Sequence, residues 1–309
     1  MILRSKRWNT SRRGPGGNHR RISIAAVVLA LCLPVHQAPS LPAADKIEGI
    51  LSVPDVLTSP GKQARLEAKL VRPGIFGQPG LGGEQVDFSV GNRRVGHAMT
   101  GGDGRAFLEY TPRMRGNQTI VARLAGSPRV KAPEAKGTLF SWERRRPLLL
   151  VQTAALVEPR KSPALPIPTG PMDGTLEASL TPVPEAAVEL KRLSEYFLNV
   201  VYVAWGGQAD PGSDATMREW LERNAFPPGV KIRVSGAASA LNEKLDELKA
   251  QGWDNVKAGI GRTAAFAEVL SERRIPVIIM PASDREEAKL PRKTAVIKGW
   301  SEVRKKLQG

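Results

Sequence analysis

The hydrophobic pattern of the chain changes at Pro147, and this change constrains the fold more than any other feature. Before Pro147, short runs of alternating apolar and polar residues are separated by segments rich in glycine and proline. After it, continuous apolar runs alternate with amphipathic segments of helical period. The first pattern is typical of half-buried antiparallel strands, and the second of a parallel sheet covered by helices on both faces. We therefore predict a β-sandwich over residues 46–143 and an α/β sandwich over residues 146–309.

The charge of the chain is unevenly distributed. Its 309 residues suffice for about two domains, and the formal net charge of +16 raises the question of a nucleic-acid partner. Seven of the 46 Lys and Arg residues lie in residues 1–44, which contain no Asp or Glu. The rest of the chain therefore has 39 basic and 30 acidic residues. No pattern of interleaved aromatic and basic residues supports RNA or DNA binding, and the export signal described next argues against it, so we expect no nucleic-acid partner.

Residues 1–44 have the form of an export signal. A basic segment precedes an apolar run of 14 residues, Ile22–Val35, and a stretch of small residues follows at Ala38–Asp45. A membrane-spanning helix needs roughly 20 apolar residues, so we expect cleavage near Ala44 and a periplasmic, cell-surface or secreted protein. An uncleaved N-terminal membrane anchor is the alternative. The pair Arg20–Arg21 is compatible with a twin-arginine route.

Few residues could hold a metal or form a disulfide. The single cysteine, Cys32, lies in the apolar run of the leader, so a processed chain would have no thiol chemistry. His19 and His36 lie in or beside the leader, and His97 stands alone. We therefore expect no metal site of the zinc type.

The sandwich region contains five runs with strand character: IEGILSV, ARLEAKLV, EQVDFSV, RAFLEYT and QTIVARLA. SPG before the second run, GEQVDFSVGNRRVG at Gly83–Gly96, and TGGDGRAFLEYTP at Thr100–Pro112 resemble bacterial immunoglobulin-like domains of the invasin type. This resemblance covers about 90 residues and implies a spacer or adhesion module without catalytic residues. We interpret Asp103 and Gly104 as a hairpin turn.

The second region alternates strands and helices. The predicted strands are 148–151, 199–205, 231–234, 254–261 and 275–280, and helices are predicted over 184–197, 217–224, 240–248 and 264–274. This order predicts an α/β sandwich with four or five mostly parallel strands. Four tryptophans, Trp205, Trp220, Trp253 and Trp300, lie at strand ends or on helices, where aromatic residues usually complete a core.

The order of these pieces resembles the haloacid dehalogenase-like (HAD) phosphatase fold over about 160 residues. The matching segments are RPLLLV, PEAAVELKRLS, NVVYVA followed by REWL and FPPG, and VKAGIGRTAAFAEVLSERRIPVIIMP. The resemblance implies a Rossmann-like sheet with catalytic groups at the ends of the first, second and fourth strands. It places the nucleophilic aspartate on Gln152, the acid/base aspartate on Ala154 and the Ser/Thr on Ala204. The acidic metal loop falls on Gly261–Arg262, and a lysine could come from Lys244, Lys249 or Lys257.

These substitutions remove the chemistry that the resemblance implies. An aspartyl-phosphate mechanism needs a carboxylate nucleophile, a second carboxyl group for proton transfer and oxygen ligands for Mg²⁺. Gln152 cannot form the acyl phosphate, Ala154 cannot transfer a proton, and Arg262 would repel the metal. We therefore interpret the second domain as a pseudo-phosphatase with a binding or scaffolding role and no cofactor.

Two alternatives stay open. One is an active hydrolase with displaced catalytic residues, such as Asp173 in MDGTL or Asp210, which would use Mg²⁺. The other is nucleotide binding, because Gly259–Ala264 satisfies G-x-G-x-x-A between a strand and a helix and Asp284 lies beyond the next strand. In that second case the glycines equally fit a tight strand-to-helix turn.

Gly261, Arg262 and Thr263 form a candidate anion site. Backbone N–H groups at the start of the following helix, with Arg262 beside them, are suited to a phosphate or carboxylate that is bound and not hydrolysed. The sequence does not identify a partner; envelope or cell-surface proteins and a phosphate-bearing ligand are the classes compatible with export.

Overall fold

The computed structural model describes residues 45–74, 77–158, 180–195, 198–205, 214–235, 237–280 and 287–308. These residues belong to one compact unit. The leader lies outside the described residues, so the export signal stays a prediction. Within the described ranges, no helix combines the length and apolar character needed to cross a bilayer.

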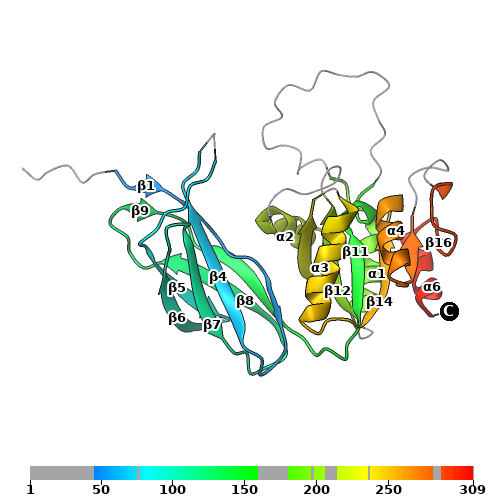
Figure 1. The fold of residues 1–309 in the computed structure, drawn as a ribbon, viewed down its shortest axis with the longest axis horizontal. Coiled ribbons are helices and arrows are strands. Elements are labelled where there is room, and N and C mark those ends of the chain that lie inside the picture. The colour runs from blue at the N-terminus through cyan, green and yellow to red at the C-terminus, as the bar shows by residue number, and fades with distance from the viewer. Residues whose placement is uncertain are drawn as a thin grey trace, which may run out of the picture. The chain divides into compact units, whose positions relative to one another are not determined.

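The first region is an Ig-like β-sandwich, as predicted. One sheet has three strands in the order β2 (Ile50–Ser52), β4 (Ala64–Val71), β7 (Arg105–Tyr110). The other has five, in the order β3 (Val56–Thr58), β10 (Ala135–Ser141), β8 (Gly116–Leu124), β5 (Gln85–Val90), β6 (Arg93–Met99). Two short strands, β1 (Ile47–Glu48) and β9 (Val130–Lys131), pair separately. Figure 1 shows these strands gathered in the blue-to-green half of the ribbon.

The sandwich core follows the period of two that the sequence shows. Along β5, the buried residues Val86, Phe88 and Val90 alternate with half-buried Gln85, Asp87 and Ser89. They pack with inward-facing residues of both sheets, among them Leu66, Leu70, Ile120 and Leu139. This burial of alternate residues from two sheets is what holds a sandwich together.

The turn at Asp103–Gly104 does not form the hairpin that was predicted. Strands β6 and β7, which it joins, belong to different sheets. Asp103 Oδ1 accepts a hydrogen bond from the N–H of Arg105 at 3.1 Å, and Gly104 has φ +77°. A Cβ at Gly104 would lie 2.1 Å from the Leu70 carbonyl oxygen, so both the conformation and the close approach require glycine.

The second region is a Rossmann-like α/β domain with a fully parallel sheet. Its six strands follow the order β13-β12-β11-β14-β15-β16. They are β11 (Leu148–Gln152), β12 (Asn199–Trp205), β13 (Val230–Val234), β14 (Val256–Gly261), β15 (Val277–Ile279) and β16 (Ala295–Val296). Numbered along the chain this is the order 3-2-1-4-5-6, which is the Rossmann order. The count of four or five strands was too low, because the two-residue β16 is too short to be recognised as a strand from its sequence.

Helices cover both faces of this sheet. The described helical segments are η1 (Thr153–Ala155), α1 (Pro184–Glu195), α2 (Asp214–Arg223), α3 (Ala238–Ala250), α4 (Ala264–Glu272), η3 (Trp300–Glu302) and α6 (Val303–Gln308). Helices α1, α2 and α6 pack on one face with Val200, Tyr202 and Ala204. Helices α3 and α4 pack on the other with Val201 and Val203.

The tryptophans behave as the sequence predicts. Trp220, Trp253 and Trp300 are buried, and Trp205 is partly buried against the core. Trp300 is fully buried, and its Nε1 donates a hydrogen bond to the Ala155 carbonyl at 3.0 Å. This bond satisfies the one polar group that a buried indole carries.

A buried carboxylate links the sandwich to the α/β region. The Asp55 side chain is 3% exposed and forms ion pairs with Arg218 of α2, at 2.8 Å, and with Lys231 of β13. Asp55 Oδ1 also accepts a hydrogen bond from the N–H of Thr138 at 2.9 Å. Leu57, Phe140 and Trp142 contact the helix-covered core beside these charges. The link therefore combines paired charges with apolar contact.

Candidate functional site

The centre of the parallel sheet is the place where this topology positions ligands. Strands β11 and β14 are neighbours, and the order of strands reverses between them. In open α/β sheets, a crevice forms outside the carboxyl ends of the two strands at such a point. Here the last residues of the two strands are Gln152 and Gly261. The site predicted from the sequence therefore falls at this position.

Gln152 spans this crevice with its own side chain. It is 1% exposed, and its Oε1 accepts hydrogen bonds from the backbone N–H of Arg262 at 2.9 Å and of Thr263 at 3.2 Å. Its Nε2 donates to Thr263 Oγ1 at 2.9 Å. An amide is suited to this place because it accepts with one atom and donates with the other.

Thr263 also begins helix α4. As the N-cap, its Oγ1 accepts a hydrogen bond from the N–H of Phe266 at 3.4 Å. The Gln152 oxygen therefore binds the N–H groups where a helix begins, a position that favours acceptors. Phosphate groups bind at such positions in many other proteins.

The guanidinium group of Arg262 holds the segment that follows β11. Nε donates to the Ala154 carbonyl at 2.9 Å, and Nη2 donates to the Val157 carbonyl at 3.1 Å. Both acceptors belong to the turn around η1 and the residues just after it. Arg262 thus cross-links the ends of β11 and β14 through backbone oxygens.

The residues that the HAD resemblance singled out are brought together only in part. Gln152, Ala154 and Arg262 are connected by the hydrogen bonds above. Ala204 is fully buried in the core with residues of α1 and α2. Lys244 lies on α3 and pairs with Glu247 at 2.7 Å, while Lys257 is exposed near the start of β14.

The two glycines of the G-x-G-x-x-A segment have a packing role. Neither Gly259 nor Gly261 has a positive φ, so a tight turn does not explain them. A Cβ at Gly259 would lie 2.1 Å from Leu270 Cδ1, and one at Gly261 would lie 2.4 Å from Phe266 Cδ1. A side chain at either position would force Leu270 or Phe266 of α4 to shift, so the glycines allow α4 to pack closely on β14.

The candidate anion donors are engaged within the protein. The N–H groups of Arg262 and Thr263, which were proposed to bind an anion, donate to Gln152 Oε1. An external phosphate or carboxylate at this place would have to replace that oxygen. The sequence shows a glutamine at a strand end and a threonine at a helix start, but it does not show that they are paired.

Three carboxylates considered in the alternatives, Asp173, Asp210 and Asp284, lie outside the described residues. Among the residues that the structure describes, no group of three or more His, Cys, Asp or Glu side chains could hold a metal ion.

Comparison with known proteins found similarity at the level of structure only. No family model matches the chain, and no curated protein matches it. Among solved structures, D,D-heptose 1,7-bisphosphate phosphatase from B. bronchiseptica, in complex with magnesium and phosphate, is 13% identical, with 52% of this chain and 98% of that chain covered and a TM-score of 0.39. The fibronectin(III)-like modules of Clostridium thermocellum CbhA are 13% identical, with 29% of this chain and 94% of that chain covered and a TM-score of 0.21. The D0-D1 domain of intimin is 19% identical, with 29% of this chain and 46% of that chain covered and a TM-score of 0.20.

Proposed function

We propose that this is an exported protein in which an Ig-like module, residues 46–143, carries a HAD-like domain, residues 146–309, that binds or scaffolds and does not catalyse phosphoryl transfer. The hydrogen-bonded position of Gln152 carries this proposal. Its carboxamide occupies the place where the HAD resemblance puts a nucleophilic carboxylate, and it bonds to Arg262 and Thr263.

The chemistry of these groups supports the absence of phosphatase activity. A carboxamide is a poor nucleophile, and the methyl group of Ala154 transfers no proton. The guanidinium of Arg262 contributes positive charge beside the position where a hydrolase of this kind would hold a divalent cation. We therefore propose that the domain works without a metal cofactor.

The proposed location outside the cytoplasm comes from the leader. Its basic segment, short apolar run and small-residue stretch are the pattern of an export signal. An Ig-like module next to a domain without catalysis fits a role in contacting other envelope or surface molecules. The partner class proposed here is therefore a protein or a phosphate-bearing ligand of the cell envelope.

Hydrolysis of p-nitrophenyl phosphate by the purified protein with Mg²⁺ tests this proposal. We expect no release of nitrophenol above the uncatalysed rate. The decisive control is Gln152→Ala, because contaminating phosphatase would act equally in both preparations. Turnover that is present in the original protein and absent from Gln152→Ala would refute the proposal.

A further inference from the structure

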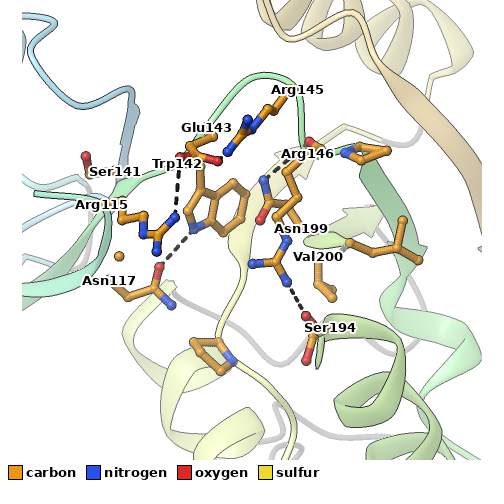
Figure 2. Close-up of a pocket in the computed structure, with 14 residues that line it drawn as sticks. Arg115, Asn117, Ser141, Trp142, Glu143, Arg145, Arg146, Ser194, Asn199 and Val200 are labelled. Atoms are coloured by element: carbon orange, nitrogen blue, oxygen red, sulfur yellow. Dashed lines mark hydrogen bonds and ion pairs between the residues drawn. The ribbon is translucent and has the colours of Figure 1, made fainter. Parts of the chain in front are cut away.

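A polar cavity lies at the opposite end of β11 from Gln152. It has a volume of about 820 Å³ and is lined at the amino ends of β11 and β12 by Arg146, Pro147 and Asn199. Residues of the sandwich, including Arg115 and Trp142, complete its wall (Figure 2). Ligand cavities of this size occur preferentially where domains meet.

Positive charge dominates the lining. Three arginines, Arg115, Arg145 and Arg146, are accompanied by the single carboxylate Glu143. Glu143 contacts Arg145 Nε at 2.9 Å and Arg115 Nη1 at 3.5 Å (Figure 2). The hydrogen bond from Arg145 is the main cause that holds the pKa of Glu143 below its ordinary value, so this carboxylate is ionised at neutral pH.

The side chains of Arg115 and Arg145 are 77% and 80% exposed. Because exposed ion pairs are weak, both guanidinium groups can exchange Glu143 for another anion at little cost. Their planar forks match the two oxygens of a carboxylate or phosphate.

Two buried polar atoms of the lining residues lack a partner. Arg146 Nη2 donates to the Ser194 carbonyl, but Arg146 Nε is buried and has no hydrogen-bond partner among the described residues. The same is true of Ser141 Oγ, whose residue is fully buried. Buried donors are almost always paired in folded proteins, so this N–H and this hydroxyl are available to an acceptor in the cavity.

The rest of the wall combines polar residues with an apolar part that includes Trp142. Trp142 is 8% exposed, and its Nε1 donates to Asn117 Oδ1 at 2.9 Å, which fixes the ring (Figure 2). Val200 and Pro147 line the same cavity. The cavity thus offers cationic donors and an apolar surface for one ligand.

We propose that this cavity binds a small organic oxyanion, a carboxylate or phosphate ester with an apolar body, through Arg115, Arg145 and Arg146. The site shares no residue with the Gln152 crevice, so it goes beyond the proposed function and stands whether or not that crevice is catalytic.

Isothermal titration calorimetry of the purified protein with phenyl phosphate, benzoate and the neutral probe benzyl alcohol tests the proposal. We expect binding of at least one anion, no comparable binding of benzyl alcohol, and weaker binding as salt is added. A preference for phenyl phosphate would identify a phosphate site, and a preference for benzoate a carboxylate site. Absence of binding by both anions, or equal binding of benzyl alcohol, would overturn the proposal.

Substitutions locate the site. Arg115→Gln and Arg145→Gln should each weaken anion binding about tenfold, because each removes a charge-assisted hydrogen bond. Arg123→Gln is the matched control, since Arg123 is 71% exposed and paired with Glu134 at 2.7 Å away from the cavity, and it should leave binding unchanged. Glu143→Gln should tighten binding, because it removes the competing carboxylate.

Two results of these substitutions would contradict binding in this cavity. Binding that survives Arg115→Gln and Arg145→Gln but is lost in Arg262→Gln would place the anion at the carboxyl end of the sheet and overturn the proposal. Weaker binding in Glu143→Gln would do the same, because it would make Glu143 a ligand group and not a competitor.

Discussion

Gln152 accepts a hydrogen bond from the backbone N–H of Arg262 at 2.9 Å, between residues 110 positions apart in the chain. The bond closes the crevice between β11 and β14 with a side chain of the protein itself. Gln152 stands where the HAD resemblance would place the nucleophile, and its side chain is bonded to the framework of the sheet. The proposed absence of phosphatase activity depends on this relationship.

Gln152→Ala should lower the free energy of unfolding by about 2–4 kcal/mol, because the half-buried N–H groups of Arg262 and Thr263 lose their acceptor and Thr263 Oγ1 loses one of its two donors. Urea unfolding followed by circular dichroism measures this change. The matched control is Gln118→Ala, a half-buried strand glutamine whose Oε1 has no partner among the described residues. That variant should change stability by less than about 1 kcal/mol, and equal losses in both variants would contradict a special role for Gln152.

The sequence predicts the central strands of the α/β domain well. Strands β11 and β12 each contain a continuous apolar run, and β12 spans the predicted residues 199–205. Strand β14 is interrupted by Lys257 but lies within the predicted range 254–261. In the sandwich, the short strands β3 and β9 and the longer strands β6 and β10 were not predicted. Strand β6 reads RRVGHAM and lies at a sheet edge with mostly exposed or half-buried residues, so it lacks the regular alternation that marks a strand.

The sequence identified single residues of the candidate site but not the contacts between them. Gln152 and Thr263 were each singled out, but their pairing depends on β11 and β14 being neighbours, which is a property of sheet order. The role of Gly259 and Gly261 was misread for a related reason. Their contacts with Leu270 and Phe266 depend on the distance between helix and strand, and the local pattern equally fits a turn.

Asp55→Asn should lower the free energy of unfolding by about 3–5 kcal/mol, because it removes the carboxylate from two largely buried cations, Arg218 and Lys231. Thermal and urea unfolding measure the loss. Asp87→Asn provides the comparison, since Asp87 pairs with the exposed Arg94 at 2.7 Å. Its cost should be less than about 1 kcal/mol; a similar cost in the two variants would show that the buried charges at Asp55 contribute no more than a surface pair.

Glu84 should make the stability of the sandwich depend on acid pH. Burial alone would raise its pKa, but hydrogen bonds from Ser127 and Arg129 and the charge of Arg129 together hold the pKa below the ordinary 4.5. A carboxylate with a lowered folded-state pKa contributes stability above its unfolded pKa, and this stability is lost as the pH falls through the folded value. Unfolding free energies measured from neutral pH downward should therefore fall below about pH 4.5, and Glu84→Gln should reduce this dependence. An unchanged slope in Glu84→Gln would assign the acid sensitivity to other groups.

Ala225→Gly should stabilise the protein. Ala225 is exposed, follows the end of α2 and has φ +58°, a conformation that costs a residue with a Cβ about 1 kcal/mol relative to glycine. We expect the melting temperature to rise by about 2–4 °C. The control is Ala265→Gly, at an exposed position inside α4, which should lower it. A lower melting temperature in Ala225→Gly would mean that the Ala225 methyl group makes a contact worth more than the strain.

The most direct test of the account is a crystal structure of the protein soaked with Mg²⁺ and tungstate, inspected where β11, β12 and β14 end. We predict that Gln152 keeps its bonds to Arg262 and Thr263 and that no Mg²⁺ binds beside Ala154 and Ala204. Mg²⁺ and tungstate bound together there among carboxylates, with Gln152 displaced, would contradict the account and identify the domain as an active phosphatase.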